Sequence, residues 1–285
     1  MSQHSRTFDL SSPVARVVFW GMVVMFIAFL LGPVFWMLST SLKPNTEIFV
    51  QFPSIFPHAP TLNSYFRATA SDGILTYLLN SSLTAGGSAL VTTALAATAA
   101  YGFAKFKFLG RRPLMLGMIA AQMLPFGLIL IGLYPVLETL KLLNTRVGLS
   151  LGYIVFALPP GIYIMYTFFI RIPNELLESA RIDGASEFVV LTKIVLPLTV
   201  PALVSVWLYS LMWAWNDLLY ALTLVSSEGL RTIGPGLLLR FFGEMQQDWG
   251  AAMAASIIAS VPIVVVFGLL QRWFLQGLTV GSLKG

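Results

Sequence analysis

The sequence predicts an all-α integral membrane protein with six transmembrane helices. Of its 285 residues, 57% are hydrophobic and only 10% are charged, whereas about a quarter of the residues in a soluble domain carry charge. The mean hydropathy is +0.82. Six segments reach or approach the roughly 20 apolar residues that an α-helix needs to cross a bilayer. The chain is therefore expected to span a membrane several times.

The predicted spans follow one another with short polar connections. They cover residues 17–39, 77–103, 113–137, 147–170, 194–225 and 249–273. The first follows a polar tail, 1–16, and is longer than the roughly 7–15 residues of a signal-peptide core. The second is the least hydrophobic, and its small residues, within 85–89 and 94–100, favour close helix contacts over lipid. Prolines in or near the spans remove backbone donors and bend helices; they are Pro33, Pro125, Pro135, Pro159, Pro160, Pro197, Pro201 and Pro262.

Basic residues are divided unequally between the two faces. With six spans, both termini and the second and fourth loops share one face. That face holds eleven of the 17 Lys and Arg, namely Arg6, Arg16, Lys105, Lys107, Arg111, Arg112, Arg171, Arg181, Lys193, Arg272 and Lys284. Because cytoplasmic loops are enriched in Lys and Arg, we expect both termini in the cytoplasm. The basic excess then follows from topology and does not indicate nucleic-acid binding.

The residues that build most catalytic and metal centres are scarce. The chain has no cysteine and only two histidines, His4 in the polar tail and His58 in a proline-rich loop. Disulfides, thiolate metal sites and cysteine nucleophiles are therefore excluded. We expect no enzyme, no bound cofactor and no metal site.

A polar segment, 171–193, interrupts the apolar sequence between the fourth and fifth predicted spans. Pro173, Asn174 and Glu175 favour the start of a short helix. Gly184 permits a turn, and Ser186 is a suitable cap for a second short helix. We expect a helix, a turn and a helix on the cytoplasmic surface, where they can meet a soluble partner. Seven charged residues lie here: Arg171, Glu175, Glu178, Arg181, Asp183, Glu187 and Lys193.

The spacing within this segment carries a resemblance. The order Glu178-Ser179-Ala180, Gly184 and then Ile194 to Pro197 resembles the EAA loop of ABC importer permeases. Ser179 stands where that pattern has an alanine, and it keeps the side chain small. Further segments, 39–43, 99–105, 158–160, 213–217 and 271–285, resemble the carbohydrate permeases of the maltose-transporter type, so the resemblance covers nearly the whole chain.

The resemblance implies a type I ABC importer permease fold in a bacterial inner membrane. It implies a second, non-identical permease, an ATPase dimer and a periplasmic solute-binding protein as partners, besides membrane lipid. The sequence contains no Walker-type GxxxxGK followed by Ser or Thr, so ATP and Mg would bind the separate ATPase subunits. The implied organisation is a tail (1–16), a first helix with an external loop (17–76), a permease core (77–276) holding the coupling loop, and a cytoplasmic tail (277–285).

The same resemblance assigns three groups of residues. ATPase coupling would use Glu175, Glu178, Ser179, Ala180, Asp183, Gly184 and Ala185. The C-terminal tail would reach the ATPase interface through Gly281, Lys284 and Gly285. The outer loop 226–248 would contact the binding protein through Gly234, Gly236, Phe241 and Phe242, although its glycines and aromatics also suit an ordinary connecting loop.

A solute pathway is expected near Asp217. A carboxylate at the bilayer centre costs about 2.5 to 3.5 kcal/mol on insertion scales, so Asp217 should face protein or water. Tyr209 and Trp213 share its helical face at four-residue spacing, and Asn216 precedes it. Rings and amides suit a sugar, but Asp217 could instead lie nearer the outer interface or pair with the partner permease. A non-sugar solute such as a polyol or phosphodiester, and a proton-coupled secondary transporter using Asp217, remain alternatives.

Overall fold

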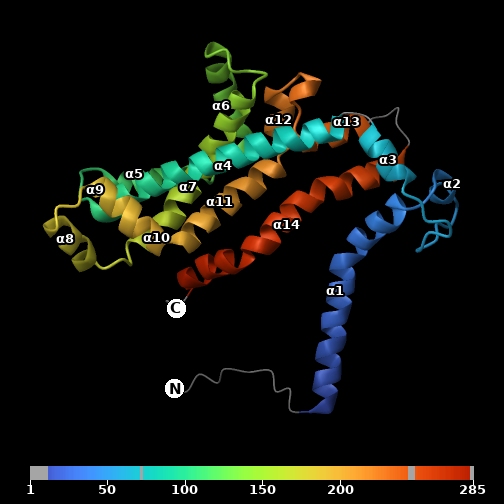
Figure 1. Cartoon of the computed structure of the whole chain (residues 1–285), viewed down its shortest axis with the longest axis horizontal. Coiled ribbons are helices and arrows are strands. Elements are labelled where there is room, and N and C mark those ends of the chain that lie inside the picture. The colour runs from blue at the N-terminus through green and yellow to red at the C-terminus, as the bar shows by residue number, and fades with distance from the viewer. Residues whose placement is uncertain (1–11, 71–72, 243–247, 283–285) are drawn as a thin grey trace. The chain divides into compact units, whose positions relative to one another are not determined.

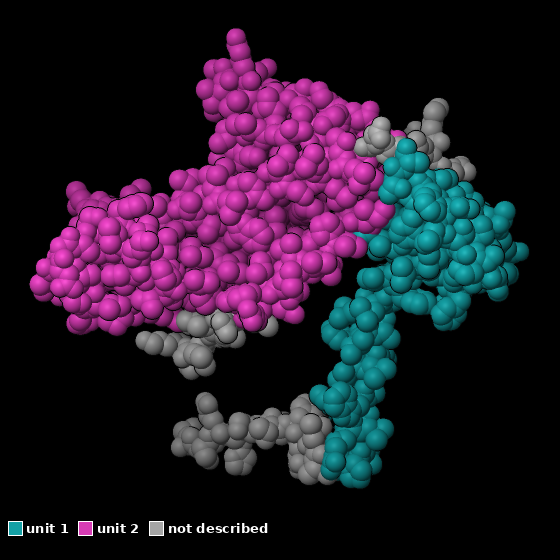
Figure 2. Space-filling model, in the orientation of Figure 1, with its two compact units in different colours: residues 1–70, 247–257 teal, residues 71–246, 258–285 magenta. Residues whose placement is uncertain are grey.

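The computed structural model describes residues 12–70, 73–242 and 248–282, with side chains described as far as Phe274. The chain divides into two compact units, one formed by 1–70 with 247–257 and the other by 71–246 with 258–285 (Figure 2). Each unit is considered by itself below.

The described residues form mostly α-helices joined by short loops (Figure 1). The α-helices are α1 (Pro13–Ser41), α2 (Asn45–Ile48), α3 (Asn63–Ala70), α4 (Gly73–Lys105), α5 (Arg111–Ala121), α6 (Phe126–Thr139), α7 (Arg146–Phe169), α8 (Asn174–Ile182), α9 (Glu187–Val189), α10 (Leu196–Leu198), α11 (Val200–Trp215), α12 (Leu219–Leu224), α13 (Ile233–Phe241) and α14 (Trp249–Ser282). A π-helix, η1 (Val190–Val195), joins α9 to α10, and a 3-10 turn, η2 (Glu228–Leu230), precedes α13.

The first unit contains α1, a candidate membrane span. Ser12 caps its start by accepting a hydrogen bond from the Ala15 amide at 3.0 Å. None of the residues in its most apolar window is buried, as expected for a helix that faces lipid. Beyond its end, Arg67 of α3 pairs with Asp248 at 2.6 Å and ties the start of α14 into this unit.

The second unit is built around α4, α7 and α11, which pack on one another. The buried side of α4 consists largely of small residues, among them Ala85, Ala89, Ala96 and Ala97. Where the three helices meet, a Cβ added to Gly161 of α7 would lie 3.0 Å from Val206 and 3.3 Å from Ala96. The small residues of the second predicted span therefore serve close helix contacts, as the sequence indicated.

Four helices are long and apolar enough to cross a membrane individually, and two bent pairs raise the number to six. The third predicted span is bent close to Pro125, and its two halves, α5 and α6, meet at 104°. The fifth is also interrupted, because the segment Glu187–Leu198 meets α11 at 83°. Pro125 adopts an extended ψ of 130° at the first bend, and Thr199 lies between two prolines at the second. Lost backbone donors explain both breaks.

The fifth span also ends earlier than the expected residue 225. Helix α11 stops at Trp215, and α12 starts at Leu219. Asp217 therefore lies in the turn between two helices and not within one.

Candidate functional site

The polar segment forms the predicted helix, turn and helix at one end of the second unit. Leu177 of α8 is fully buried in a cluster that includes Phe169 and Val190. Lys105, the last residue of α4, donates hydrogen bonds to the Ile172 carbonyl at 2.7 Å and to Asn174 Oδ1 at 3.1 Å. Helix α8 is thus fixed to the ends of α4 and α7.

The turn after α8 requires glycine. Gly184 has a φ of +85°, which costs other residues about 1–2 kcal/mol. Its amide donates to the Arg181 carbonyl, and the Ala185 amide donates to the Ala180 carbonyl, both at 3.0 Å. This pair of bonds is a Schellman motif. Ser186 then accepts the Val189 amide at 3.4 Å and caps α9, as predicted.

The carboxylate of Glu187 connects three helices around this turn, a role that the sequence did not indicate. Glu187 of α9 accepts two hydrogen bonds from Arg181 of α8, at 2.7 and 3.2 Å. It also accepts the hydroxyl of Tyr101 of α4 at 2.6 Å. The hydrogen bonds to Glu187 raise the pKa of Arg181. The sequence placed Glu187 among the charged residues of the segment. It did not indicate the contact with Tyr101, because Tyr101 lies far away in the chain.

The outer surface of α8 and α9 combines charged and apolar side chains. Glu175, Glu178, Ser179, Asp183 and Gly184 are exposed, while Ala180 and Ala185 are half-buried. Between them lie Ile182, 85% exposed, and Phe188, 73% exposed. Large apolar side chains held this far out on an anchored turn are typical of an interaction surface.

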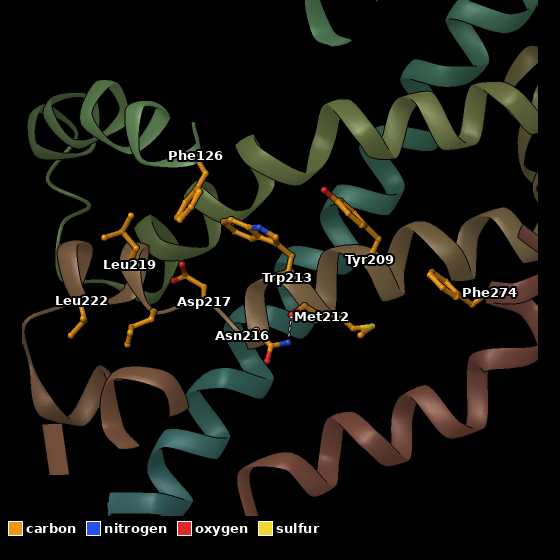
Figure 3. Close-up of a pocket in the computed structure, with 10 residues that line it drawn as sticks. Phe126, Tyr209, Met212, Trp213, Asn216, Asp217, Leu219, Leu222 and Phe274 are labelled. Carbon is orange, nitrogen blue, oxygen red and sulfur yellow. Dashed lines mark hydrogen bonds between the residues drawn. The ribbon is translucent and has the colours of Figure 1, made fainter. Parts of the chain in front are cut away.

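The four residues expected near a solute pathway line a single cleft in the second unit. Its volume is about 820 Å³, within the usual range of small-molecule sites. Figure 3 shows Phe126, Trp213 and Asp217 directed toward the same space, with Tyr209 farther along α11. The lining residues are Phe126, Tyr209, Met212, Trp213, Asn216, Asp217, Leu218, Leu219, Leu222 and Phe274.

Trp213 lies in an aromatic cluster at this cleft. Its ring stacks on Phe156 with centroids 4.0 Å apart, and its edges meet Tyr153 at 5.7 Å and Tyr220 at 5.5 Å. Neighbouring Asn216 is exposed and donates to the Met212 carbonyl at 2.7 Å. The described residues make no hydrogen bond to its Oδ1, which leaves one acceptor for a ligand.

Asp217 is occupied by its own chain. It is 8% exposed and accepts the amides of Tyr220 at 3.2 Å and Ala221 at 2.9 Å, and the hydroxyl of Tyr153 at 3.1 Å. These bonds satisfy the free amides at the start of α12. Asp217 therefore joins α7 to α12 within this chain, and the positions raised from the sequence, at the outer interface or against the partner permease, stay predictions.

The outer-loop residues fall into two groups. A Cβ on Gly236 would lie 2.2 Å from the ring of Tyr77, and one on Gly234 would lie 2.7 Å from the Asp217 carbonyl oxygen. These glycines face the interior, and Phe241 is also buried, whereas Phe242 is exposed. The exposed apolar residues beside it, Leu238 and Leu239, were not singled out in the sequence.

The structure gives no side-chain positions for the residues singled out in the C-terminal tail. Gly281 lies near the end of α14, where side chains are not described, and Lys284 and Gly285 lie outside the described residues.

Bent candidate membrane spans and an exposed helical turn on a buried base describe a multi-pass membrane protein with a surface suited to a partner. Residues 89–280 match the family model described as the binding-protein-dependent transport system inner membrane component, and the chain belongs to this family. It is accordingly a multi-pass inner-membrane permease and not an enzyme.

Individual relatives match almost end to end. The chain is 34% identical to the diacetylchitobiose uptake system permease protein DasC of Streptomyces coelicolor, covering 92% of this chain and 95% of the relative. It is 34% identical to the trehalose/maltose transport system permease protein MalG of Thermococcus litoralis, covering 90% and 92%. A crystal structure of a bacterial ABC transporter involved in the import of alginate has a chain with a TM-score of 0.81 at 20% identity, covering 94% and 99%. That likeness shows the fold.

Proposed function

We propose that this permease forms half of the translocation pathway of an ATP-driven importer for a sugar or sugar derivative. Its coupling element is the loop 171–193, and its partners are a second, non-identical permease, an ATPase dimer and a periplasmic binding protein. ATP and Mg act on the ATPase subunits, and this chain binds no cofactor.

The observation that carries the coupling proposal is the anchored turn between α8 and α9. Leu177 and Lys105 hold its base, while Ile182 and Phe188 stand exposed beside Glu178 and other charges. A rigid base transmits displacement, and exposed apolar residues in a polar rim suit a protein interface. The exposed surface of α8 and α9 is therefore better suited to a contact with a cleft on a soluble subunit than to exposure to water.

The sugar proposal rests on the cleft and on the relatives. Aromatic rings of Trp213, Tyr209 and Phe126 can stack on the apolar faces of a sugar, and Asn216 offers an amide for its hydroxyls. The relatives are described as permeases for diacetylchitobiose and for trehalose and maltose. A structure of the alginate transporter with its alginate-loaded periplasmic protein, at a TM-score of 0.64, supports a binding protein as partner.

Coupling is tested by changing the turn. Glu178→Arg and Gly184→Val should abolish uptake while the protein still inserts, because the docking surface changes and the buried base does not. Gly110→Val measures the stability cost of the same change, since Gly110 has a similar φ of +88° and, as at Gly184, nothing lies within 4 Å of an added Cβ. Uptake that persists in both variants would make the coupling assignment wrong.

The solute is tested by purifying the assembly and measuring ligand binding to its binding protein. Sugars should bind, and a polyol or phosphodiester should not. A proton-coupled transporter is the second alternative, and it predicts uptake by this chain alone, driven by a pH gradient and indifferent to ATP. Failure to recover any ATPase with the chain would overturn the main proposal.

A further inference from the structure

The loop between α4 and α5 combines cations with apolar side chains. Residues 105–112 read Lys-Phe-Lys-Phe-Leu-Gly-Arg-Arg, and no Asp or Glu occurs between Asp72 and Glu138. The basic residues of this loop indicate that it lies on the cytoplasmic face, and Lys105 also hydrogen-bonds to Ile172 and Asn174. We call residues 106–112 the basic segment.

Three cations of this segment have no acidic partner among the residues that the structure describes. The ion pairs found within residues 12–70, 73–242 and 248–282 do not include Lys107, Arg111 or Arg112. Arg111 donates to the Tyr166 hydroxyl of α7 at 3.0 Å, and its guanidinium lies 5.6 Å from the centre of that ring. The contact holds one guanidinium in place without neutralising it.

A pocket of about 240 Å³ lies at the start of α5. Arg111, Arg112 and Tyr166 supply its polar side, and Met115 and Leu116 supply its apolar side. A ligand that fills both sides carries a negative charge next to a hydrocarbon part. Phospholipids have this construction, and a guanidinium matches a phosphate with two parallel hydrogen bonds.

The apolar residues of the segment point to the same environment. Leu109 is 102% exposed, between Lys107 and Arg111. Phe106 and Phe108 remain partly exposed although their rings contact Tyr101 at 5.9 Å and Phe103 at 5.6 Å. Cations alternating with exposed apolar side chains are typical of segments that lie at the headgroup and acyl boundary.

We propose that the basic segment and its pocket bind an anionic phospholipid of the cytoplasmic leaflet. The phosphate lies between Arg111 and Arg112, the first acyl carbons lie on Met115 and Leu116, and Leu109 enters the bilayer. Lys107 adds attraction to the anionic surface, where basic residues beside a span are drawn to acidic lipids. Charge complementarity favours this occupant, because the segment contains no acidic residue to repel it.

The test measures lipid retained by the complete protein in nanodiscs of phosphatidylcholine with a minor fraction of phosphatidylglycerol. Native mass spectrometry should show phosphatidylglycerol enriched on the wild type. Each cation removed, by Arg111→Gln or Arg112→Gln, should weaken retention about fivefold at low salt. Arg112 is exposed, so Arg112→Gln tests the site without disturbing the Tyr166 contact.

Arg272→Gln is the matched control, because Arg272 is exposed, is expected on the same face and stacks on Trp273 at 3.7 Å. It should weaken retention less than Arg112→Gln does, because Arg272 does not line the pocket and adds only general attraction to the anionic surface. Equal retention of the two lipids, or equal loss in the control, would overturn the proposal. Binding of free glycerol phosphate without any preference between the two lipids would assign the pocket to a soluble phosphate. Loss of ATPase binding in Arg112→Gln with lipid retained would assign the segment to a protein contact, and both outcomes contradict a lipid site.

Discussion

At the α8–α9 end of the second unit, buried residues hold exposed ones outward, whereas at the α12–α13 end three of the residues singled out in the sequence, Asp217, Gly236 and Phe241, are themselves buried. Leu177 is fully covered while Ile182 is 85% exposed. At the other end, Asp217 accepts a hydrogen bond from Tyr153, and Gly236 packs against the ring of Tyr77. The contrast teaches that available hydrogen bonds and exposed surface, more than residue type, distinguish a contact site from a structural one.

The largest effect separates two aliphatic residues of α8. Leu177→Ala should lower the free energy of unfolding by about 2–5 kcal/mol, because it leaves a cavity in the core. Ile182→Ala should change it by less than about 0.5 kcal/mol, as an exposed substitution, yet weaken retention of the ATPase. Unfolding in mixed micelles and co-purification measure the two effects. Similar losses of stability in both variants would contradict the distinction between a buried base at Leu177 and an exposed contact surface at Ile182.

Next, we expect Gly236→Val to destabilise the protein by about 1–3 kcal/mol or more through overpacking. The added Cβ would overlap the buried ring of Tyr77. Gly229→Val is the control, because nothing lies within 4 Å of a Cβ there. The measured quantity is the thermal midpoint in detergent. If the variant keeps the wild-type thermal midpoint but no longer binds the periplasmic binding protein, Gly236 belongs to the binding-protein contact surface instead.

A smaller loss is expected for Asp217→Ala, about 1–2 kcal/mol, because two amides at the start of α12 lose their acceptor. Tyr153→Phe removes one of the donors to the same carboxylate. Since the two residues share a hydrogen bond, the double variant should lose less than the sum of the single losses. Additive losses would contradict the pairing, and lost uptake at full stability would make Asp217 a solute ligand.

The smallest effect concerns Glu187. Its pair with Arg181 is partly exposed, with side-chain exposures of 37% and 43%, so Glu187→Gln should cost less than about 1 kcal/mol. Salt should reduce the difference from the wild type, because it screens exposed charges. Unfolding at low and high ionic strength tests this. A salt-independent loss would indicate that the Tyr101 hydrogen bond carries the effect.

Much of the fold could be predicted because membrane spans are long local signals. All six predicted spans correspond to one apolar helix or to a bent pair. Hydropathy measures length and not axis direction, so the prolines predicted bends but not angles as large as 104° and 83°. Pro33, Pro135 and Pro262 lie inside continuous helices, so the presence of a proline does not by itself predict where a span breaks.

The candidate sites differ in the same way. The turn at Gly184 was predictable, because a cap, a glycine and a short helix are set within a dozen neighbouring residues. The surroundings of Asp217 were not, because Tyr153 lies 64 residues earlier in the chain. Four-residue spacing correctly grouped Tyr209 and Trp213, but it could not show that the helix ends before Asp217.

The break at Thr199 has a mechanical consequence. The segment that leaves the coupling loop, Glu187–Leu198, contains a π-helix and meets α11 at 83°. Under the coupling proposal, a push along this segment would be directed nearly perpendicular to the axis of α11. Such a push would move the end of α11 sideways and not along its own axis, and with it the cleft that α11 lines.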